Sequence, residues 1–222
     1  MVEQNTAINQ QTRRGIWVTV ISILVVISLF MGLFLHKVLS PSILSPVELR
    51  ANGAVVFDQP RMIRDFVLLD HNQQRFDLSR FVGNWTLVYF GFTQCPDICP
   101  ATLAQINELL QHLDTATKER LQVVLVSVDP ARDTPERLAA YVTHFNPDFI
   151  GVTGEFLQIM QLTQDVNVAF SKVMLGDDYT IDHTGHLVLL NPKGHYHGFF
   201  KAPFELSRLK LTLRSIIASA KL

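Results

Sequence analysis

The sequence has no marked excess of charge of either sign and very few cysteines. Its 222 residues carry 19 Lys and Arg against 20 Asp and Glu, a formal net charge of −1 at pH 7. No basic field would attract nucleic acid, so nucleic-acid binding is excluded as a class. There is no internal repeat or low-complexity tract, and the two cysteines can form at most one disulfide. The length suits one well-buried domain and an additional segment.

The additional segment is an uncharged apolar run near the N-terminus. Residues 15–35 are 21 positions without a charged side chain, and such a helix spans the roughly 30 Å of bilayer hydrocarbon. A cleaved signal peptide has a shorter apolar region, of about 7–15 residues, ending in a small-x-small site. Here the run leads instead into His36 and Lys37. We therefore interpret it as an uncleaved signal anchor.

The basic residues around the apolar run indicate its orientation. Arg13 and Arg14 precede the run, while Lys37 is the only Lys or Arg that follows it before Arg50. This bias favours a cytoplasmic N-terminus. Pro41, Pro46 and Pro60 then predict a spacer between the membrane and the domain. The predicted organisation is a cytoplasmic N-terminus at 1–14, an anchor at 15–35, a spacer at 36–61 and a folded domain at 62–222.

Within the domain, short apolar runs alternate with helical patterns. The runs predict strands, and stripes of apolar residues three and four apart predict helices. Strands are expected at 66–69, 85–90, 121–128, 186–190 and 196–200, and helices around 103–113, 134–145, 155–164 and 204–218. This order predicts an α/β fold with a central mixed sheet flanked by helices. It is the order of a thioredoxin-like fold with an inserted helix, in which reactive cysteines lie where a core strand meets its helix.

The two cysteines occupy that place in the segment 91–100, GFTQCPDICP. Pro100 belongs in the first turn of a helix, which puts Cys99 at the helix start and Cys95 in the preceding loop. The positive end of the helix dipole favours the thiolate there. A purely structural disulfide would gain little from closing so short a loop. Redox exchange and metal binding therefore remain as the two functional alternatives.

A metal site would need a third ligand, for which an imidazole suits both Cu(I) and Cu(II) beside two thiolates. Three residues separate the cysteines instead of the two usual in redox members of this fold class, which leaves room for an ion without forbidding exchange. His183 is the leading candidate, because it precedes a core strand in a loop that should face the cysteines. His186 is its nearest competitor. His195 and His197 are two apart on a strand and could form a surface pair or simply face solvent.

The sequence resembles the Sco/SenC family of membrane-anchored copper chaperones that serve cytochrome c oxidase assembly. Three blocks carry the resemblance: 91–100, 127–135 (SVDPARDTP), and Tyr179 with the Asp-His-Thr of 182–184. With the anchor, it covers roughly residues 15–220. The resemblance implies that Cys95, Cys99 and His183 are the copper ligands.

The resemblance also implies a partner and a compartment. The partner would be subunit II of cytochrome c oxidase, whose dinuclear copper centre would receive copper, have its cysteines reduced, or both. A copper donor and a thiol reductant, both unidentified, would act before it. Because the N-terminus is unlike an Arg-rich transit peptide, we expect a bacterial inner membrane with the domain in the periplasm. The family implies a metallochaperone rather than an enzyme, and the alternative is an extracytoplasmic thiol–disulfide oxidoreductase.

Two further features of the sequence can each be interpreted in two ways. Asp97, between the cysteines, could cap the helix or take part in partner docking. The block 127–135 could form a turn and a helix cap or recognise a partner.

Overall fold

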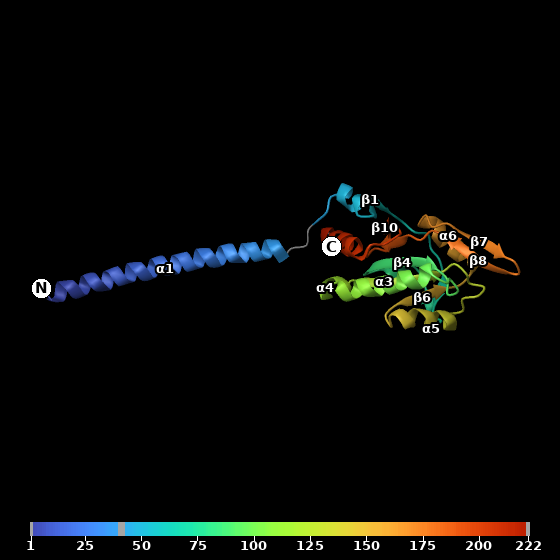
Figure 1. The fold of residues 1–222 in the computed structure, drawn as a ribbon, viewed down its shortest axis with the longest axis horizontal. Coiled ribbons are helices and arrows are strands. Elements are labelled where there is room, and N and C mark those ends of the chain that lie inside the picture. The colour runs from blue at the N-terminus through green and yellow to red at the C-terminus, as the bar shows by residue number, and fades with distance from the viewer. Residues whose placement is uncertain (1, 40–42, 221–222) are drawn as a thin grey trace. The chain divides into compact units, whose positions relative to one another are not determined.

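The computed structural model describes residues 2–39 and 43–220, which belong to two separate units divided between Ser42 and Ile43. The first unit is helix α1, Val2–Leu39 (Figure 1). Its segment Ile16–Leu35 has a mean hydropathy of 2.8 and no buried part, so it is long and apolar enough to cross a membrane. The predicted span therefore lies within one continuous helix.

The second unit begins before residue 62, which corrects the predicted spacer. Helix α2, Pro46–Ala51, is capped by Ser45, whose Oγ accepts the Glu48 N–H while the Glu48 carboxylate accepts the Ser45 N–H. Strand β1, Ala54–Arg61, joins the sheet through β10. The prolines that indicated a spacer fit these elements, because Pro46 opens a helix and Pro60 lies in an edge strand. Residues 40–42 of the predicted spacer lie outside the described residues.

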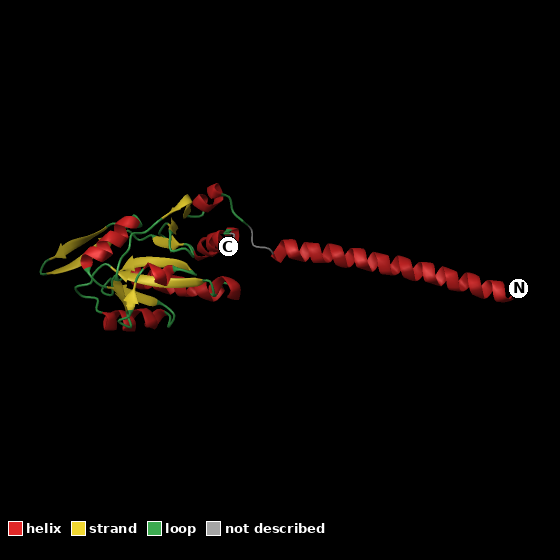
Figure 2. Ribbon diagram, turned by 180° about the vertical axis from the view of Figure 1, so that it is seen from behind, coloured by secondary structure: helices red, strands yellow, loops and turns green. Residues whose placement is uncertain are grey.

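The core of this unit is a mixed eight-stranded sheet with the order β1-β10-β9-β4-β5-β6-β2-β3. Figure 2 shows strands in yellow with helices in red around them. Strands β4, β5 and β6 are parallel, and the other neighbours are antiparallel. Besides β1, the strands are β2 Leu68–Asp70, β3 Arg75–Phe76, β4 Trp85–Gly91, β5 Leu121–Ser127, β6 Ile150–Thr153, β9 Leu187–Leu190 and β10 Tyr196–Phe200. The predicted mixed sheet is thus confirmed.

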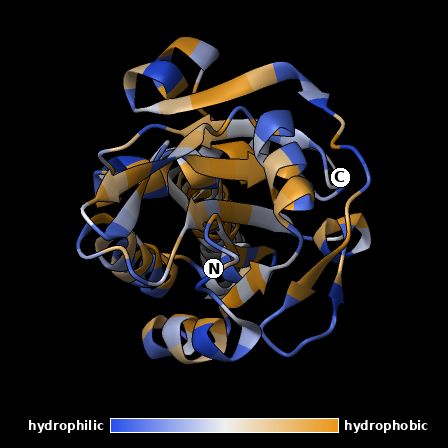
Figure 3. Cartoon of the chain, turned by 90° about the vertical axis from the view of Figure 1, so that its right-hand side faces the viewer, coloured by the Kyte–Doolittle hydropathy of each residue, from blue (hydrophilic) through white to orange (hydrophobic). Residues whose placement is uncertain are grey.

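Helices cover this sheet and bury its central strands. They are α3 Ile98–His112, α4 Thr115–Lys118, α5 Pro135–Phe145, α6 Phe156–Asp165 and α7 Leu206–Ser219, with a 3₁₀ turn η1 at Leu78–Phe81. Helix α3 contacts α5, as expected when right-handed crossovers between the parallel strands β4, β5 and β6 place their helices on one face, and it also contacts α7. Every residue of β4 is buried, so both faces of the sheet are covered, and the apolar colour of the inner strands in Figure 3 agrees. The carboxyl end of β4 is therefore a rigid platform for the loop that follows.

A hairpin that the sequence did not predict stands apart from this sheet. Strands β7, Phe170–Leu175, and β8, Asp178–His183, pair only with each other among the described strands. They turn at Gly176, whose φ of +66° lies in the region that glycine adopts most easily. Most of β7 is exposed, so it shows none of the alternation that marks a half-buried strand. The sequence predicted His183 in a loop, but it is the last residue of β8.

Candidate metal centre

The cysteines lie at the junction of β4 and α3, as predicted. Cys95 is half-buried in the loop, Cys99 is fully buried in the first turn of α3, and both are free thiols. The backbone N–H of Cys99 donates to Cys95 Sγ at 3.4 Å. Gly91 is the last residue of β4, and a Cβ added to it would lie only 3.0 Å from Cys99 Sγ. A larger residue there would press on Cys99 Sγ, because the helix start packs closely against the strand.

His183 reaches the cysteine pair from the end of β8. Its Nε2 lies 3.6 Å from Cys99 Sγ, and its ring meets those of Tyr89 and Phe92 edge-on at 5.9 and 6.2 Å between centroids. Its Nδ1 lies 3.3 Å from the carbonyl oxygen of Thr184. A carbonyl can only accept, so Nδ1 carries the proton and the Nε2 lone pair faces the sulfur. The predicted third ligand is therefore close to the thiols and oriented to coordinate.

The distance between Cys99 Sγ and His183 Nε2 fits a soft metal ion bound to both atoms. Ligands bound at about 2.0 Å for nitrogen and 2.3 Å for sulfur, at an angle of 110–120°, lie roughly 3.5–3.7 Å apart. The 3.6 Å between Cys99 Sγ and His183 Nε2 falls in that range. No group of three His, Cys, Asp or Glu side chains within residues 2–39 and 43–220 is already arranged around one point. The spacing that already suits an ion is therefore that of Cys99 and His183.

The two thiols differ in acidity because they are hydrogen-bonded to each other. The pKa of Cys95 falls to about 4, first because the Cys99 thiol donates to its sulfur, and then because the Cys99 backbone N–H does so. The same contact and burial raise the pKa of Cys99 above the ordinary value for a thiol. The half-exposed Cys95 is thus the thiolate of the pair, and the buried Cys99 holds its proton.

This difference predicts how the reduced protein reacts with iodoacetamide. A lowered pKa makes Cys95 the thiolate at every pH above about 4, so its alkylation should stay fast from pH 8 down to pH 6 and halve near pH 4. Mass spectrometry of the peptide that contains Cys95 measures the rate. In Cys99→Ala the midpoint should rise, since the main hydrogen-bond donor is gone. A midpoint of 8–9 in the unmutated protein would contradict the assignment.

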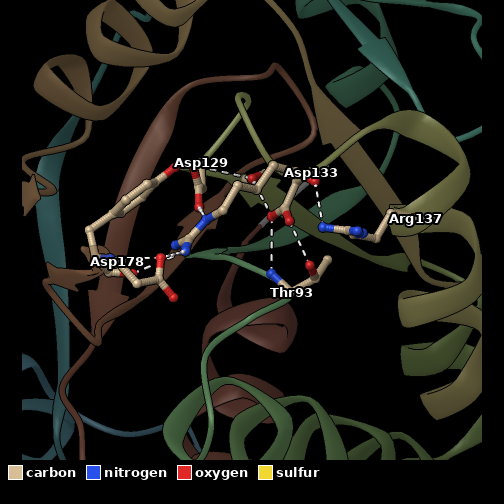
Figure 4. A network of polar contacts seen from close by, with 8 residues as sticks. Thr93, Asp129, Asp133, Arg137 and Asp178 are labelled. Carbon is tan, nitrogen blue, oxygen red and sulfur yellow. Dashed lines mark hydrogen bonds and ion pairs between the residues drawn. The ribbon is translucent and has the colours of Figure 1, made fainter. Parts of the chain in front are cut away.

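The Asp133 carboxylate holds the cysteine loop in place through hydrogen bonds. Its fully buried carboxylate accepts hydrogen bonds from Thr93 N–H at 3.0 Å, Thr93 Oγ1 at 2.6 Å and Ser127 Oγ at 2.6 Å (Figure 4). Thr93 lies two residues before Cys95, and Ser127 is the last residue of β5. The carboxylate therefore ties the cysteine loop to the loop between β5 and α5.

Arg132 makes the corresponding link to the hairpin. Its Nε donates to the buried Asp129, while its Nη1 donates to Asp178 at 3.2 Å and to the Tyr179 carbonyl at 3.0 Å. The guanidinium lies 3.7 Å above the Tyr179 ring, whose hydroxyl donates to Asp129 at 2.9 Å. Tyr179 and His183 share strand β8. The segment 127–133 thus joins the strand that carries the imidazole to the loop that carries the thiols, as Figure 4 shows.

These supporting residues were not predicted as such. The expected helix cap is confirmed, because Thr134 Oγ1 accepts the Arg137 N–H at 3.3 Å at the start of α5. The supporting role of Asp129, Arg132 and Asp133 was missed. The available signal was three charged residues directly after a buried strand, since buried charges require partners.

Asp97, His186 and His197 do not join Cys95, Cys99 and His183. Asp97 is exposed and its side chain makes no capping hydrogen bond, so the capping interpretation is wrong. His186 stacks on Phe199 with centroids 4.9 Å apart, and His197 packs against Trp85 at 5.0 Å. Burial lowers the pKa of both imidazoles. His197 is therefore not the solvent-facing half of a pair with His195.

Comparison with known proteins places this chain in a family. The SCO1/SenC family model matches residues 57–218. The SCO2-like protein of Rickettsia conorii is 37% identical over 184 residues, which are 80% of this chain and 87% of the relative. Copper-bound yeast Sco1 is 29% identical with a TM-score of 0.66, covering 73% of this chain and 91% of that one.

A second solved structure agrees. Bradyrhizobium japonicum ScoI with copper bound is 30% identical with a TM-score of 0.62, covering 69% of this chain and 98% of that one. These likenesses confirm the predicted thioredoxin-like fold, with β4, the cysteine loop and α3 at its centre. The chain therefore belongs to the SCO1/SenC family.

Proposed function

We propose that this protein is a copper-binding assembly factor for cytochrome c oxidase and that Cys95, Cys99 and His183 are its copper ligands. The observation that carries the proposal is the 3.6 Å approach of His183 Nε2 to Cys99 Sγ, beside Cys95. Two thiolates and an imidazole suit copper in both of its oxidation states. Copper is bound in the solved yeast and Bradyrhizobium relatives, which supports the same ligand chemistry here.

The arrangement of the two thiols supports delivery to a partner. Cys95 is the half-exposed thiolate, so incoming and outgoing copper would meet it first, while the buried Cys99 and His183 would hold the ion from behind. The partner proposed is subunit II of cytochrome c oxidase, whose cysteines would take the ion by exchanging one thiolate ligand at a time. A separate donor would load the protein.

Reduction of the partner's cysteines is the second candidate function, favoured by the lowered pKa of Cys95. The Cys95 thiolate would attack a disulfide of the target and release one target thiolate, which takes up a proton. Cys99 would then lose its proton and attack Cys95, forming the Cys95–Cys99 disulfide and releasing the second target thiol. Two electrons pass to the target, and a thiol reductant must restore the pair.

A copper titration tests the ligand set. The reduced domain 43–222 should bind one Cu(I) tightly in competition with a chromogenic chelator, and His183→Ala should weaken the affinity at least tenfold by removing a ligand. His195→Ala is the matched control and should leave the affinity unchanged. Equal affinities of the unmutated protein and His183→Ala would remove the imidazole from the site. Turnover of a disulfide substrate, indifferent to copper and to His183, would instead favour the oxidoreductase.

We also propose that α1 anchors the protein in a bacterial inner membrane with the domain in the periplasm. The uncharged segment Ile16–Leu35 and the preceding Arg13 and Arg14 support this orientation. Protease added to spheroplasts should digest residues 43–222. Protection of the domain until the membrane is lysed would reverse the assignment.

A further inference from the structure

A pocket that lies outside the metal centre is lined by cationic side chains. It has a volume of about 420 Å³ and lies where the end of α2, the end of β10 and the start of α7 meet. Arg50, Lys201 and Arg208 line it, together with apolar walls that include Pro203 and Phe204. Neither the copper proposal nor the redox alternative uses these residues.

The backbone around the pocket is held in place. The Lys201 N–H donates to the Gly53 carbonyl at 2.9 Å, and Ala54 pairs with Phe200 in the register of β1 and β10. Phe200 and Leu209 are almost fully buried. The two segments that carry Arg50 and Lys201 are therefore fixed to each other, and only the ends of the cationic side chains need to adjust to a ligand.

The charges in the pocket are incompletely neutralised. Glu205 pairs with Arg208 at 2.7 Å and is the only acidic residue in the lining. No ion pair of Arg50 or Lys201 occurs within residues 43–220. The positive charge of Lys201 also reaches His186, whose pKa is lowered by burial and secondarily by this lysine. The pocket therefore carries two cations without a partner beside apolar walls.

We infer that this pocket binds a phosphate group that carries an uncharged organic substituent, as in the headgroup of an anionic phospholipid or in a small soluble phosphate ester, because its cations would repel a cationic substituent such as choline. Arg50 can donate two parallel hydrogen bonds to phosphate oxygens, and Lys201 adds a point charge. The apolar walls suit the carbon part of the ligand. Arg50 follows the last residue of α1 by 11 positions, so a lipid source is at hand if α1 spans a membrane as proposed.

The test uses the full chain in lipid nanodiscs and follows amide hydrogen exchange at residues 50–53 and 200–208. One arm compares nanodiscs of phosphatidylcholine with nanodiscs that also contain phosphatidylglycerol. The other arm adds glycerol phosphate to the phosphatidylcholine nanodiscs. Binding should slow exchange in these two segments, and Arg50→Gln with Lys201→Gln should weaken the effect by roughly fivefold for each cation removed. Lys118→Gln with Lys193→Gln is the matched control, because it removes two exposed positive charges outside the pocket.

Each outcome decides the inference. Slower exchange only with phosphatidylglycerol assigns a lipid headgroup, slower exchange only with glycerol phosphate assigns a soluble ester, and slower exchange in both arms assigns phosphate esters in general. Unchanged exchange in both arms, or an equal loss in the pocket and control variants, overturns the inference. Exchange in β4 should be the same in all variants, which verifies folding. Cu(I) affinity of the pocket variant should also be unchanged, so a failure here is separate from a failure of the copper proposal.

Discussion

Replacing Asp133 by Ala should lower the free energy of unfolding of the domain 43–222 by about 3–5 kcal/mol. The carboxylate is fully buried and accepts three hydrogen bonds, from the backbone and side chain of Thr93 and from Ser127. Alanine would leave the buried Ser127 hydroxyl and the two half-buried Thr93 donors without this acceptor, and it would also leave a cavity. Urea denaturation followed by circular dichroism measures the change, at a fixed pH and with both cysteines reduced.

Two further variants make this result specific. Asp133→Asn keeps one acceptor oxygen, so its loss should be smaller than that of Asp133→Ala. Asp148→Ala removes an exposed carboxylate and should change stability by less than about 0.5 kcal/mol. If Asp133→Ala were no less stable than Asp148→Ala, the buried carboxylate would not be what holds the cysteine loop.

Replacing Arg132 by Lys should weaken Cu(I) binding about 10- to 100-fold, the usual effect of losing a residue that orients a metal ligand. Lysine keeps the charge but cannot bond Asp129 and the Tyr179 carbonyl at once, nor lie flat over the Tyr179 ring. The strand that carries His183 would then be free to shift relative to the thiols. Chelator competition measures the affinity, and a thermal melt verifies that the domain still folds.

The matched control for this prediction is Arg137→Lys. Arg137 also comes from the 127–137 region, but its side chain donates to the Arg132 carbonyl and, within residues 43–220, forms no hydrogen bond or ion pair with β8 or the cysteine loop. Its copper affinity should stay within about twofold of the unmutated protein. Equal affinities of Arg132→Lys and the unmutated protein would show that the hairpin is positioned by its other contacts.

Elements built on repeated apolar spacing were predictable from the sequence. The continuous apolar runs of β4 and β5 and the helical stripe of α3 depend on local pattern alone. The cysteine positions followed from the same junction, with Pro100 marking the first turn. The choice of His183 as the proposed third ligand came from the family resemblance, because spacing left His186 as a competitor.

Other features depend on tertiary context that no local pattern records. Strand β1 contains Pro60 and only one fully buried residue, Ala54, so its sequence resembles that of a linker. Its pairing with β10 is visible only in the folded structure. Strand β7 is exposed along most of its length and alternates no more than a loop does. The contacts of Arg132 join residues 46 and 47 positions apart in the sequence. Such pairings are determined by the packed fold and not by neighbours along the chain.

The separation between the donors sets an order of events during biogenesis. Cys95 and Cys99 are neighbours along the chain, whereas His183 follows Cys99 by 84 residues. Bringing the imidazole to the sulfurs closes a long loop, an entropic cost that only the completed sheet and the docked hairpin can offset. A newly made, unfolded chain would therefore offer a copper ion two thiols and no fixed imidazole. Full affinity should arise only once the domain has folded, which would delay metal loading until maturation is complete.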